Sequence, residues 1–261
     1  MPNSPRLSTF HPPVPFSTAP SVALAPRGKP LAVALFDGAA MGVYPSLARL
    51  FGYRFRVGNT PALAADAARV IAAAWGKSGI APPPPDVADY GDRYAQAVDT
   101  WIVAYHRGEP VGSMALLDMR RASLSLELGN KRVPAQLDLD VTREIARLAI
   151  VPAHRGGSQM VMVGLLREML AWSVENGVVT LFSGSRPPLF RVYERFNPTA
   201  RLVVPDDNHA SEEPRRARYF AALRAAGGAS GVHFTFEVAG ASPWNVFSRF
   251  LTGRLRRSAA R

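Results

Sequence analysis

Apolar residues recur along this chain with two periods, and each period predicts a different kind of element. After Thr60 and Pro61, which suit the cap and first turn of a helix, residues 60–79 carry apolar side chains at helical spacing. Residues 53–58 and residues 232–238 instead alternate between apolar and polar side chains, which is typical of half-buried strands. The pattern therefore predicts a strand followed by an amphipathic helix, and a further strand near the C-terminal end.

The middle of the chain carries two β-rich runs joined by a short turn. Residues 100–108 and 109–119 have a His-Arg-Gly-Glu turn between their apolar stretches, which indicates an antiparallel hairpin. Another strand is expected across residues 141–151, where Pro152 ends it. The run that follows, residues 157–177, has apolar side chains at helical spacing and a glycine at its end that suits a C-cap.

The remaining pattern completes a series of strands and helices. It predicts a strand at 178–184, a short helix at 187–196, a strand at 200–204 and a helix at 214–228. This order favours one mixed α+β or α/β sheet in a single domain with extensions. The expected segments are a disordered arm at 1–30, a helical extension at 31–52, the main domain at 53–240 and a basic amphipathic tail at 241–261.

Composition narrows the chemistry. The chain has 261 residues, and 48% of them are hydrophobic, which is enough for a sizeable core. It has no cysteine, which excludes disulfide frameworks, thiolate metal sites and cysteine nucleophiles. Its five histidines lie too far apart in the sequence for a local metal motif. No metal site is expected.

The charge balance predicts an anionic partner. The formal net charge is +11, from 31 basic and 20 acidic side chains, which favours nucleic acid, anionic lipid or an acidic protein. No recognition-helix motif or aromatic-basic interleaving supports nucleic acid. Residues 1–30 lack the basic and apolar regions of a secretory signal, so we expect a cytoplasmic protein. The apolar run at 31–53 contains charged residues and a proline, which favours a packed helix over a membrane span.

One stretch combines a carboxylate with a glycine pair. If residues 143–151 form a strand, one face carries Glu144, Ala146, Leu148 and Ile150 and the other carries Arg147, unless a bulge re-aims them. The next helix begins at the sequence Arg-Gly-Gly-Ser-Gln, where free backbone N–H groups suit an anionic phosphate. These are the parts of a site that holds a nucleotide-tailed or pantetheine-tailed donor and deprotonates an acceptor.

The stretch ARLAIVPAHRGG resembles the hallmark of the GNAT acyltransferase superfamily, a strand that leads into a helix gripping the donor's pyrophosphate or phosphopantetheine. The resemblance implies an α+β (α/β mixed) fold, with a central, mostly antiparallel sheet flanked by helices and with N- and C-terminal extensions. Ser158 and Met160 replace two glycines of the family's Arg-x-x-Gly-x-Gly pattern. Their side chains crowd the approach of a pyrophosphate, which favours a phosphopantetheine donor on a carrier protein.

Further residues resemble a narrower branch, the acyl-homoserine-lactone synthases and long-chain N-acyl amino acid synthases, which take an acyl group from acyl carrier protein. The matching positions are Arg69 and Trp75 on a helix, Asp89 and Asp92 in a loop, Gly112 in the hairpin, and Glu144 and Arg147 on a strand. The sequence Gly-Ser-Met begins at this hairpin glycine, and homoserine-lactone synthases usually carry an arginine just after the glycine. This favours the acyl amino acid branch. The resemblance covers roughly residues 53–204.

The resemblance implies a role for each matching residue. Glu144, alone or through a water, is the general base, and Tyr193 is the acid that protonates the leaving thiolate. The expected donor-binding residues are Leu148, Ala149, Ile150, Arg155, Gly156, Gly157 and Ser158. The expected substrate-binding residues are Arg69, Trp75, Asp89, Asp92 and Arg147.

Each of these residues could instead have a purely structural role. Glu144 could pair with Arg143 or Arg147 at the surface, and Tyr193 could be a packing aromatic. The corresponding structural roles are turn formation for Asp89, Asp92, Gly156 and Gly157, a solvated side chain for Arg69 and a core anchor for Trp75.

The leading hypothesis is an N-acyltransferase that moves a medium- or long-chain acyl group from acyl carrier protein, or from acyl-CoA, to the amine of an amino acid or similar small molecule. No tightly bound cofactor is expected, and the product class suggests lipid signalling. The basic tail is a candidate for peripheral association with the inner face of the membrane; the alternative is a solvated or docked helix. The competing functions are an acetyl-CoA-dependent N-acetyltransferase and a non-catalytic GNAT-fold protein that binds lipid or nucleic acid.

Overall fold

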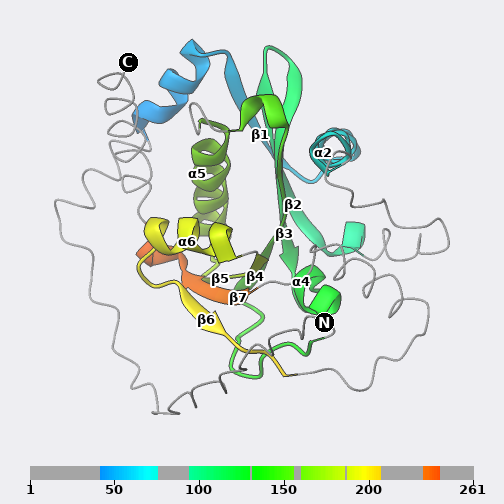
Figure 1. Cartoon of the computed structure of the whole chain (residues 1–261), viewed down its shortest axis with the longest axis vertical. Helices are drawn as coiled ribbons and strands as arrows, with labels where there is room; N and C mark the ends of the chain where they lie inside the picture. The colour runs from blue at the N-terminus through cyan, green and yellow to red at the C-terminus, as the bar shows by residue number, and fades with distance from the viewer. Residues whose placement is uncertain are drawn as a thin grey trace, which may run out of the picture.

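The computed structural model (Figure 1) describes residues 42–75, 94–129, 131–155, 160–185, 187–206 and 232–241. Its centre is a seven-stranded sheet with the strand order β1-β2-β3-β4-β5-β7-β6. β4 and β5 pair in parallel, and the other neighbouring pairs are antiparallel. The expected mixed, mostly antiparallel sheet flanked by helices is confirmed.

The elements follow the predicted order. The strands are β1 (Tyr53–Gly58), β2 (Val98–His106), β3 (Glu109–Asp118), β4 (Thr142–Ile150), β5 (Thr180–Ser185), β6 (Arg201–Val203) and β7 (Val232–Glu237). The helices are α2 (Pro61–Trp75), α4 (Leu124–Gly129), α5 (Met160–Glu175) and α6 (Pro187–Phe196), with short 3-10 turns η2 (Pro152–His154) and η3 (Val238–Gly240). The periodicity does not predict α4. The helix expected at 214–228, the arm at 1–30 and residues 242–261 of the tail lie outside the described residues.

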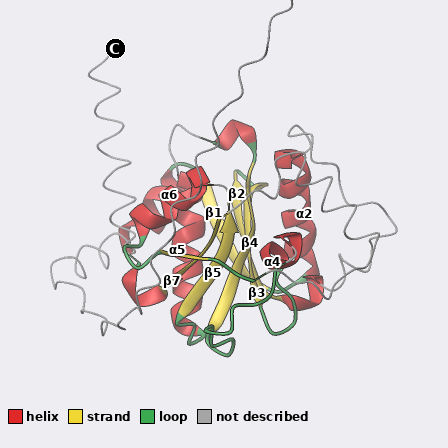
Figure 2. Ribbon diagram, turned by 60° about the horizontal axis from the view of Figure 1, so that its bottom comes forward, coloured by secondary structure: helices red, strands yellow, loops and turns green. Residues whose placement is uncertain are grey.

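The sheet separates two layers of helices (Figure 2). α2 and α4 cover one face, and α5 and α6 cover the other. The larger core lies under α5 and α6, where Leu165 and Leu166 of α5 pack with Ile102, Phe234 and other buried residues of the sheet. Under α2, Leu63 and Ala67 pack with strand residues that point to the opposite face. The predicted apolar faces of both helices therefore face the sheet.

The hairpin between β2 and β3 closes with a two-residue turn. His106 pairs with Glu109, and Arg107 and Gly108 between them have φ values of 51° and 94°. Two successive positive φ values match the right-handed twist of the flanking strands, so this tight turn fixes the register of the hairpin.

A helix formed by residues 42–50 packs against α5. Tyr44 and Ala48 of this helix are buried in the larger core, and the Tyr44 hydroxyl donates a hydrogen bond to the Met160 carbonyl at the start of α5. Burial raises the pKa of Tyr44, which keeps this hydroxyl a donor. Within the described ranges, no helix is both long and apolar enough to cross a membrane.

Candidate functional site

β4 contains a bulge near its centre. Ala146 pairs with Ala115 of β3 and Ala149 pairs with Ser113, so two β4 residues, Arg147 and Leu148, lie in the interval that a single β3 residue fills. Arg147 has φ 53°, a left-handed conformation that costs a non-glycine residue about 1–3 kcal/mol. The Ser113 hydroxyl donates to the Arg147 carbonyl over 3.3 Å, which helps to hold the bulge in place.

The bulge corrects one prediction from the sequence. Glu144 and Ala146 face the α2 and α4 layer, but Leu148 and Ile150 pack against the core under α5. Ala149 faces α2 instead. Of the two alternatives from the sequence, the uninterrupted strand with these four residues on one face is wrong and the bulge is confirmed, because one extra residue in the strand reverses the alternation beyond it.

β4 and β5 pair over only part of their lengths. Their register begins at Thr142 and Thr180 and ends at Ile145 and Ser183, whose hydroxyl donates to the Ile145 carbonyl over 3.1 Å. Beyond that point, residues 146–150 of β4 have no strand partner on the β5 side within the described residues. The bulge lies in this separated half. An extended ligand could add to such a strand edge through backbone hydrogen bonds.

Glu144 lies where the two strands begin to separate, and it is fully buried. One of its oxygens, Oε1, accepts a hydrogen bond from the Ser125 backbone N–H over 2.7 Å. Burial raises the pKa of Glu144, while the hydroxyls of Ser123 and Ser125 and the N–H groups of Leu124 and Ser125 oppose that rise. The alternative of a surface ion pair does not fit a buried carboxylate. Its neighbour Arg143 pairs instead with Asp99 over 2.5 Å.

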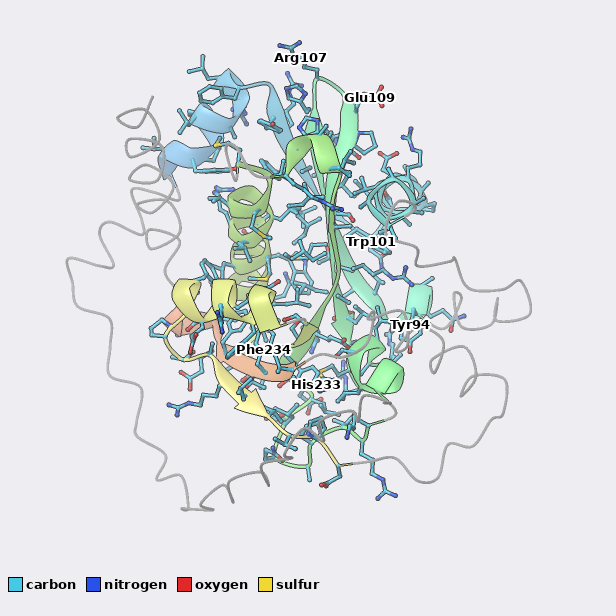
Figure 3. All side chains as sticks on the ribbon, in the orientation of Figure 1. Tyr94, Trp101, Arg107, Glu109, His233 and Phe234 are labelled. Atoms are coloured by element: carbon cyan, nitrogen blue, oxygen red, sulfur yellow. The ribbon has the colours of Figure 1, made fainter. Side chains whose placement is uncertain are left out.

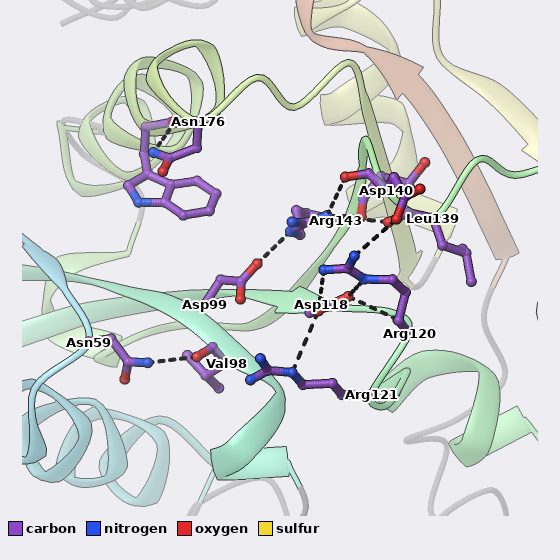
Figure 4. A network of polar contacts seen from close by, with 12 residues as sticks. Asn59, Val98, Asp99, Asp118, Arg120, Arg121, Leu139, Asp140, Arg143 and Asn176 are labelled. Atoms are coloured by element: carbon purple, nitrogen blue, oxygen red, sulfur yellow. Dashed lines mark hydrogen bonds and ion pairs between the residues drawn. The ribbon is translucent and has the colours of Figure 1, made fainter.

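A network of charged residues holds the segment that contacts Glu144 (Figure 4). Arg120 binds both oxygens of the buried Asp118, at 2.9 Å through Nε and 2.8 Å through Nη2, and it also reaches Asp140. The hydrogen bonds from Arg120 lower the pKa of Asp118. The turn after β3 is thereby tied to the loop before β4, and residues 123–125 follow directly from it.

The residues around Glu144 were not predicted. Ser123 and Ser125 flank the first residue of α4, and His233 of β7 donates from Nε2 to the Ser125 carbonyl over 3.2 Å. A serine immediately before a helix is a common N-cap, and this is the one sequence signal that points to Ser123. No local pattern connects Ser125 with His233, because their contact depends on how β5 and β7 are ordered in the sheet.

Tyr193 is separated from Glu144 by the sheet. It lies on α6, fully buried, with ring centroids 5.1 Å from Phe234 and 5.7 Å from Phe236. Glu144 is in register with Phe182, which belongs to the cluster beneath α4 on the opposite face. Burial raises the pKa of Tyr193 above its usual range. The placement matches the packing alternative, and the role of Tyr193 as the acid stays a prediction.

Arg155 joins the end of β4 to α2. Its Nε donates to the Ile150 carbonyl over 2.6 Å, and its Nη2 donates to the Ala74 carbonyl in the last turn of α2 over 3.0 Å. A guanidinium is favourable at that negative helix end. Arg155 therefore orients the start of the loop that contains Gly156, Gly157 and Ser158. These three residues lie outside the described residues.

The expected substrate-binding residues are less closely grouped. The exposed Arg69 forms an ion pair with Asp66 over 2.5 Å on the surface of α2. The structure therefore does not bring Arg69 to the buried carboxylate of Glu144. Trp75 is the last residue of α2, and only its main chain is described. Asp89 and Asp92 lie outside the described residues, whereas Arg147 lies at the bulge.

Comparison with solved structures identifies the fold. The AHL synthase LasI aligns with a TM-score of 0.50 and 14% identity over 75% of this chain and 95% of that chain. Two further solved structures are similar at lower scores. FeeM, an N-acyl amino acid synthase from uncultured soil microbes, has a TM-score of 0.46 and 11% identity over 71% of this chain and 91% of its own. An acetyltransferase of the GNAT family from Staphylococcus aureus has a TM-score of 0.42 and 10% identity, with coverages of 71% and 99%.

The chain has the GNAT fold. No protein-family model and no curated protein matches its sequence. Within this GNAT fold, the structure places Glu144, the bulge at Arg147 and Leu148, and Arg155 along one continuous stretch. A buried carboxylate with a raised pKa therefore lies beside an unpaired strand edge, an arrangement that can accept a proton next to a bound extended ligand.

Proposed function

We propose that this protein is a GNAT-type N-acyltransferase that moves a medium- or long-chain acyl group from acyl carrier protein to the amine of an amino acid or similar small amine. The proposal depends above all on the position of Glu144. This buried carboxylate, whose pKa is raised by burial, lies where β4 separates from β5. A base with a raised pKa is suited to removing a proton from an ammonium group near neutral pH.

The proposed reaction is a direct transfer. Glu144, directly or through one water, takes a proton from the acceptor ammonium, and the free amine attacks the thioester carbonyl. The new C–N bond forms and the C–S bond breaks; the attacking nitrogen releases its second proton, and the leaving pantetheine thiolate takes up one proton to become the thiol. Backbone N–H groups in the bulged half of β4 would hold the pantetheine arm and stabilise the negative charge on the carbonyl oxygen.

The donor and the partners are the finer part of the proposal. Carrier proteins are acidic, and a net charge of +11 favours their diffusional approach. Ser158 and Met160, which replace glycines of the family pattern, also favour a phosphopantetheine arm over a free pyrophosphate. An N-acyl amino acid product would partition into lipid. A basic tail at 241–261 on the inner face of the membrane would suit its release.

Transfer assays with different acyl donors test this function. The purified protein is incubated with acyl carrier protein charged with a series of chain lengths, or with acetyl-CoA and long-chain acyl-CoA, together with a mixture of amino acids. Thiol release and product mass are followed. We expect amide products from the charged carrier protein. Products from acetyl-CoA alone would show an ordinary N-acetyltransferase, and the absence of product from every donor would leave a non-catalytic protein.

A variant pair tests the base. We expect Glu144→Gln to lower transfer by about 100-fold or more, because the amide cannot accept the proton. The matched control is Glu109→Gln, since Glu109 lies exposed in the hairpin at the opposite end of the molecule from His233 (Figure 3). The control should keep full activity. Undiminished transfer by Glu144→Gln across the pH range would exclude the general-base role.

A further inference from the structure

Apolar strand residues flank the buried carboxylate of Glu144 within the sheet. Glu144 is in register with Leu117 of β3 and with Phe182 of β5, and neither side chain can form a hydrogen bond. The segment at the start of α4 supplies them instead. Its Ser125 N–H donates to Glu144 Oε1 over 2.7 Å, and its Ser123 hydroxyl also favours the charged carboxylate. The ionisation of Glu144 therefore depends on where this segment lies.

The helix that carries this segment is too short to hold its own position. α4 has six residues, and a helix of that length has little stability by itself and depends on tertiary contacts. It packs on β4 and β5, where Leu126 is buried with Met119 and Phe182. The exact placement of Ser125 at the first turn therefore requires contacts of its own.

Two strands hold Ser125 in place. On β5, Gly184 has no side chain, and a Cβ there would lie 2.4 Å from Ser125 Cβ, so only a glycine lets the start of α4 lie this close to the sheet. On β7, His233 pairs with Gly184 and donates from Nε2 to the Ser125 carbonyl over 3.2 Å. Ser125 thus accepts a hydrogen bond from β7 through its carbonyl and donates one to Glu144 through its N–H.

The ring of His233 is itself held in a defined orientation. It stacks on Phe182, with ring centroids 5.8 Å apart and an interplanar angle of 17°. Burial and the charge of Lys131 lower the pKa of His233, while the hydrogen bond to Ser125 opposes that change. Because a carbonyl can only accept, Nε2 carries a proton in the neutral ring as well as in the charged one. The contact with Ser125 therefore does not depend on the protonation of the ring.

Charged side chains at adjoining strand positions are engaged elsewhere. Arg143 precedes Glu144 on β4 and pairs with Asp99 over 2.5 Å, and the buried Asp118 of β3 is bound by an arginine. Arg143 and Asp118 are in register with each other, one position from Glu144 and its partner, so they lie on the other face of the sheet. After burial, the largest influences on the pKa of Glu144 come from neutral hydroxyl and N–H groups of residues 123–125.

We propose that His233 is a positioning residue for the general base: through the Ser125 carbonyl, it holds the Ser125 N–H on Glu144 Oε1. This inference rests on the proposed function and extends it, because it names a residue on β7 that acts on the base through another residue. Loss of a hydrogen bond that favours an ionised carboxylate raises the pKa of that carboxylate. Without His233, Glu144 retains its proton to higher pH, and less of the enzyme carries a free base at a given pH.

Carbon-13 NMR of protein labelled at its glutamates measures the titration of Glu144 without catalysis. The Glu144 signal is assigned by its loss in Glu144→Gln. His233→Phe removes the ring donor but keeps an aromatic ring beside Phe182. We expect the titration midpoint of Glu144 to rise by about one pH unit in this variant, as for one lost hydrogen bond to a charged group. An unchanged midpoint in folded His233→Phe would overturn the proposal.

His233→Gln is the conservative variant, because its side-chain N–H can still donate to the Ser125 carbonyl. We expect it to restore most of the wild-type midpoint. A midpoint as high as in His233→Phe would show that packing of the ring, and not its hydrogen bond, places Ser125, which overturns the proposal. If His233→Phe does not fold, His233→Leu, which also lacks a donor, takes its place in both comparisons.

His106→Phe is the matched control. His106 is also half-buried and in contact with an aromatic ring, with centroids 4.7 Å from Tyr53. Its neighbour Arg107 lies at the opposite end of the molecule from His233 (Figure 3). The control should keep the wild-type midpoint of Glu144. A rise equal to that in His233→Phe would show a general effect of losing a histidine and would overturn the proposal.

Kinetics separate this inference from the proposed function. If the protein transfers acyl groups, we expect the acidic limb of the kcat/KM profile to move to higher pH in His233→Phe, with about tenfold lower kcat/KM on that limb and a wild-type value at the alkaline plateau. Transfer with an unchanged profile would overturn the positioning role and leave the function standing. A raised Glu144 midpoint in His233→Phe, with no transfer by the wild type from any donor, would overturn the function and leave the control of Glu144 by His233 standing.

Discussion

The two faces of the sheet bury different chemistry. Under α5 and α6 the core is apolar and aromatic, with Tyr193, Phe234 and Phe236 in contact with one another. The face under α2 and α4 also contains apolar clusters, but it buries the carboxylate of Glu144 as well. Apolar burial contributes stability, whereas buried polar atoms without partners oppose it. The comparison indicates that one face mainly stabilises the fold and the other contains the candidate site.

The largest expected effect is on the rate of acyl transfer, and it compares one substitution on each face of the sheet. Glu144→Gln should lower transfer by about 100-fold or more, whereas Tyr193→Phe should leave kcat within about twofold, because its hydroxyl lies across the sheet from the site. Steady-state kinetics with the preferred donor measures both. A loss of kcat in folded Tyr193→Phe comparable to that of Glu144→Gln would contradict the division and restore Tyr193 as the acid.

The next largest effect is on the free energy of unfolding, again compared for one substitution on each face of the sheet. Phe234→Ala should lower the free energy of unfolding by about 3–5 kcal/mol, because the ring is fully buried in the aromatic core. Ser123→Ala should change it by only about 1 kcal/mol, because it removes a single hydroxyl beside Glu144. Urea denaturation measures both values. Equal losses would show that the α4 face also carries the stability of the fold.

Two glycines allow a matched test of close packing. A Cβ at Gly112 would lie 2.4 Å from Val161 Cγ1 on the α5 side, and a Cβ at Gly184 would lie 2.4 Å from Ser125 Cβ on the α4 side. Each glycine-to-alanine change should cost about 1–3 kcal/mol of stability through overpacking. Gly184→Ala alone should also lower acyl transfer, because its Cβ displaces Ser125. If Gly112→Ala lowered transfer as much, the effect would reflect general distortion of the sheet.

The smallest effect is the dependence of stability on pH. The raised pKa of Glu144 means that the folded state holds this proton more tightly than the unfolded state, so its contribution falls as pH rises above about 4. The lowered pKa of Asp118 has the opposite sign, and its contribution is lost as pH falls below about 4.

Urea unfolding of the wild type, Glu144→Gln and Asp118→Asn from acid to neutral pH separates the two contributions. The stability of the wild type relative to Glu144→Gln should decline as pH rises, and its stability relative to Asp118→Asn should decline as pH falls. Parallel curves for the wild type and Glu144→Gln would show that burial does not perturb this carboxyl group.

Much of the fold follows from local patterns. Alternation predicts β1 and β7, helical spacing predicts α2 and α5, and the turn at Arg107 and Gly108 predicts the hairpin. These predictions are confirmed because each depends on residues that are close together in the sequence. The periodicity does not predict α4, which has only six residues and is too short to show a repeating apolar face.

The site was predicted less completely. The motif around Glu144 draws attention to that residue, but its alternation does not show the bulge at Arg147, because a single inserted residue leaves the composition of a strand unchanged. The serines at 123 and 125 reach Glu144 only because the turn after β3 folds back along β4, and their role stays a proposal.

By itself, the sequence determines the elements of this protein, their order, and the presence of a carboxylate before a glycine-containing turn. The tertiary structure decides which side chains share a face. The register shift places Leu148 across the sheet from Glu144, and the strand order brings His233 to Ser125 while Tyr193 packs on the opposite side. The physical reason is that secondary structure depends on neighbours in the chain, whereas burial and side-chain contacts depend on strand pairing between distant segments.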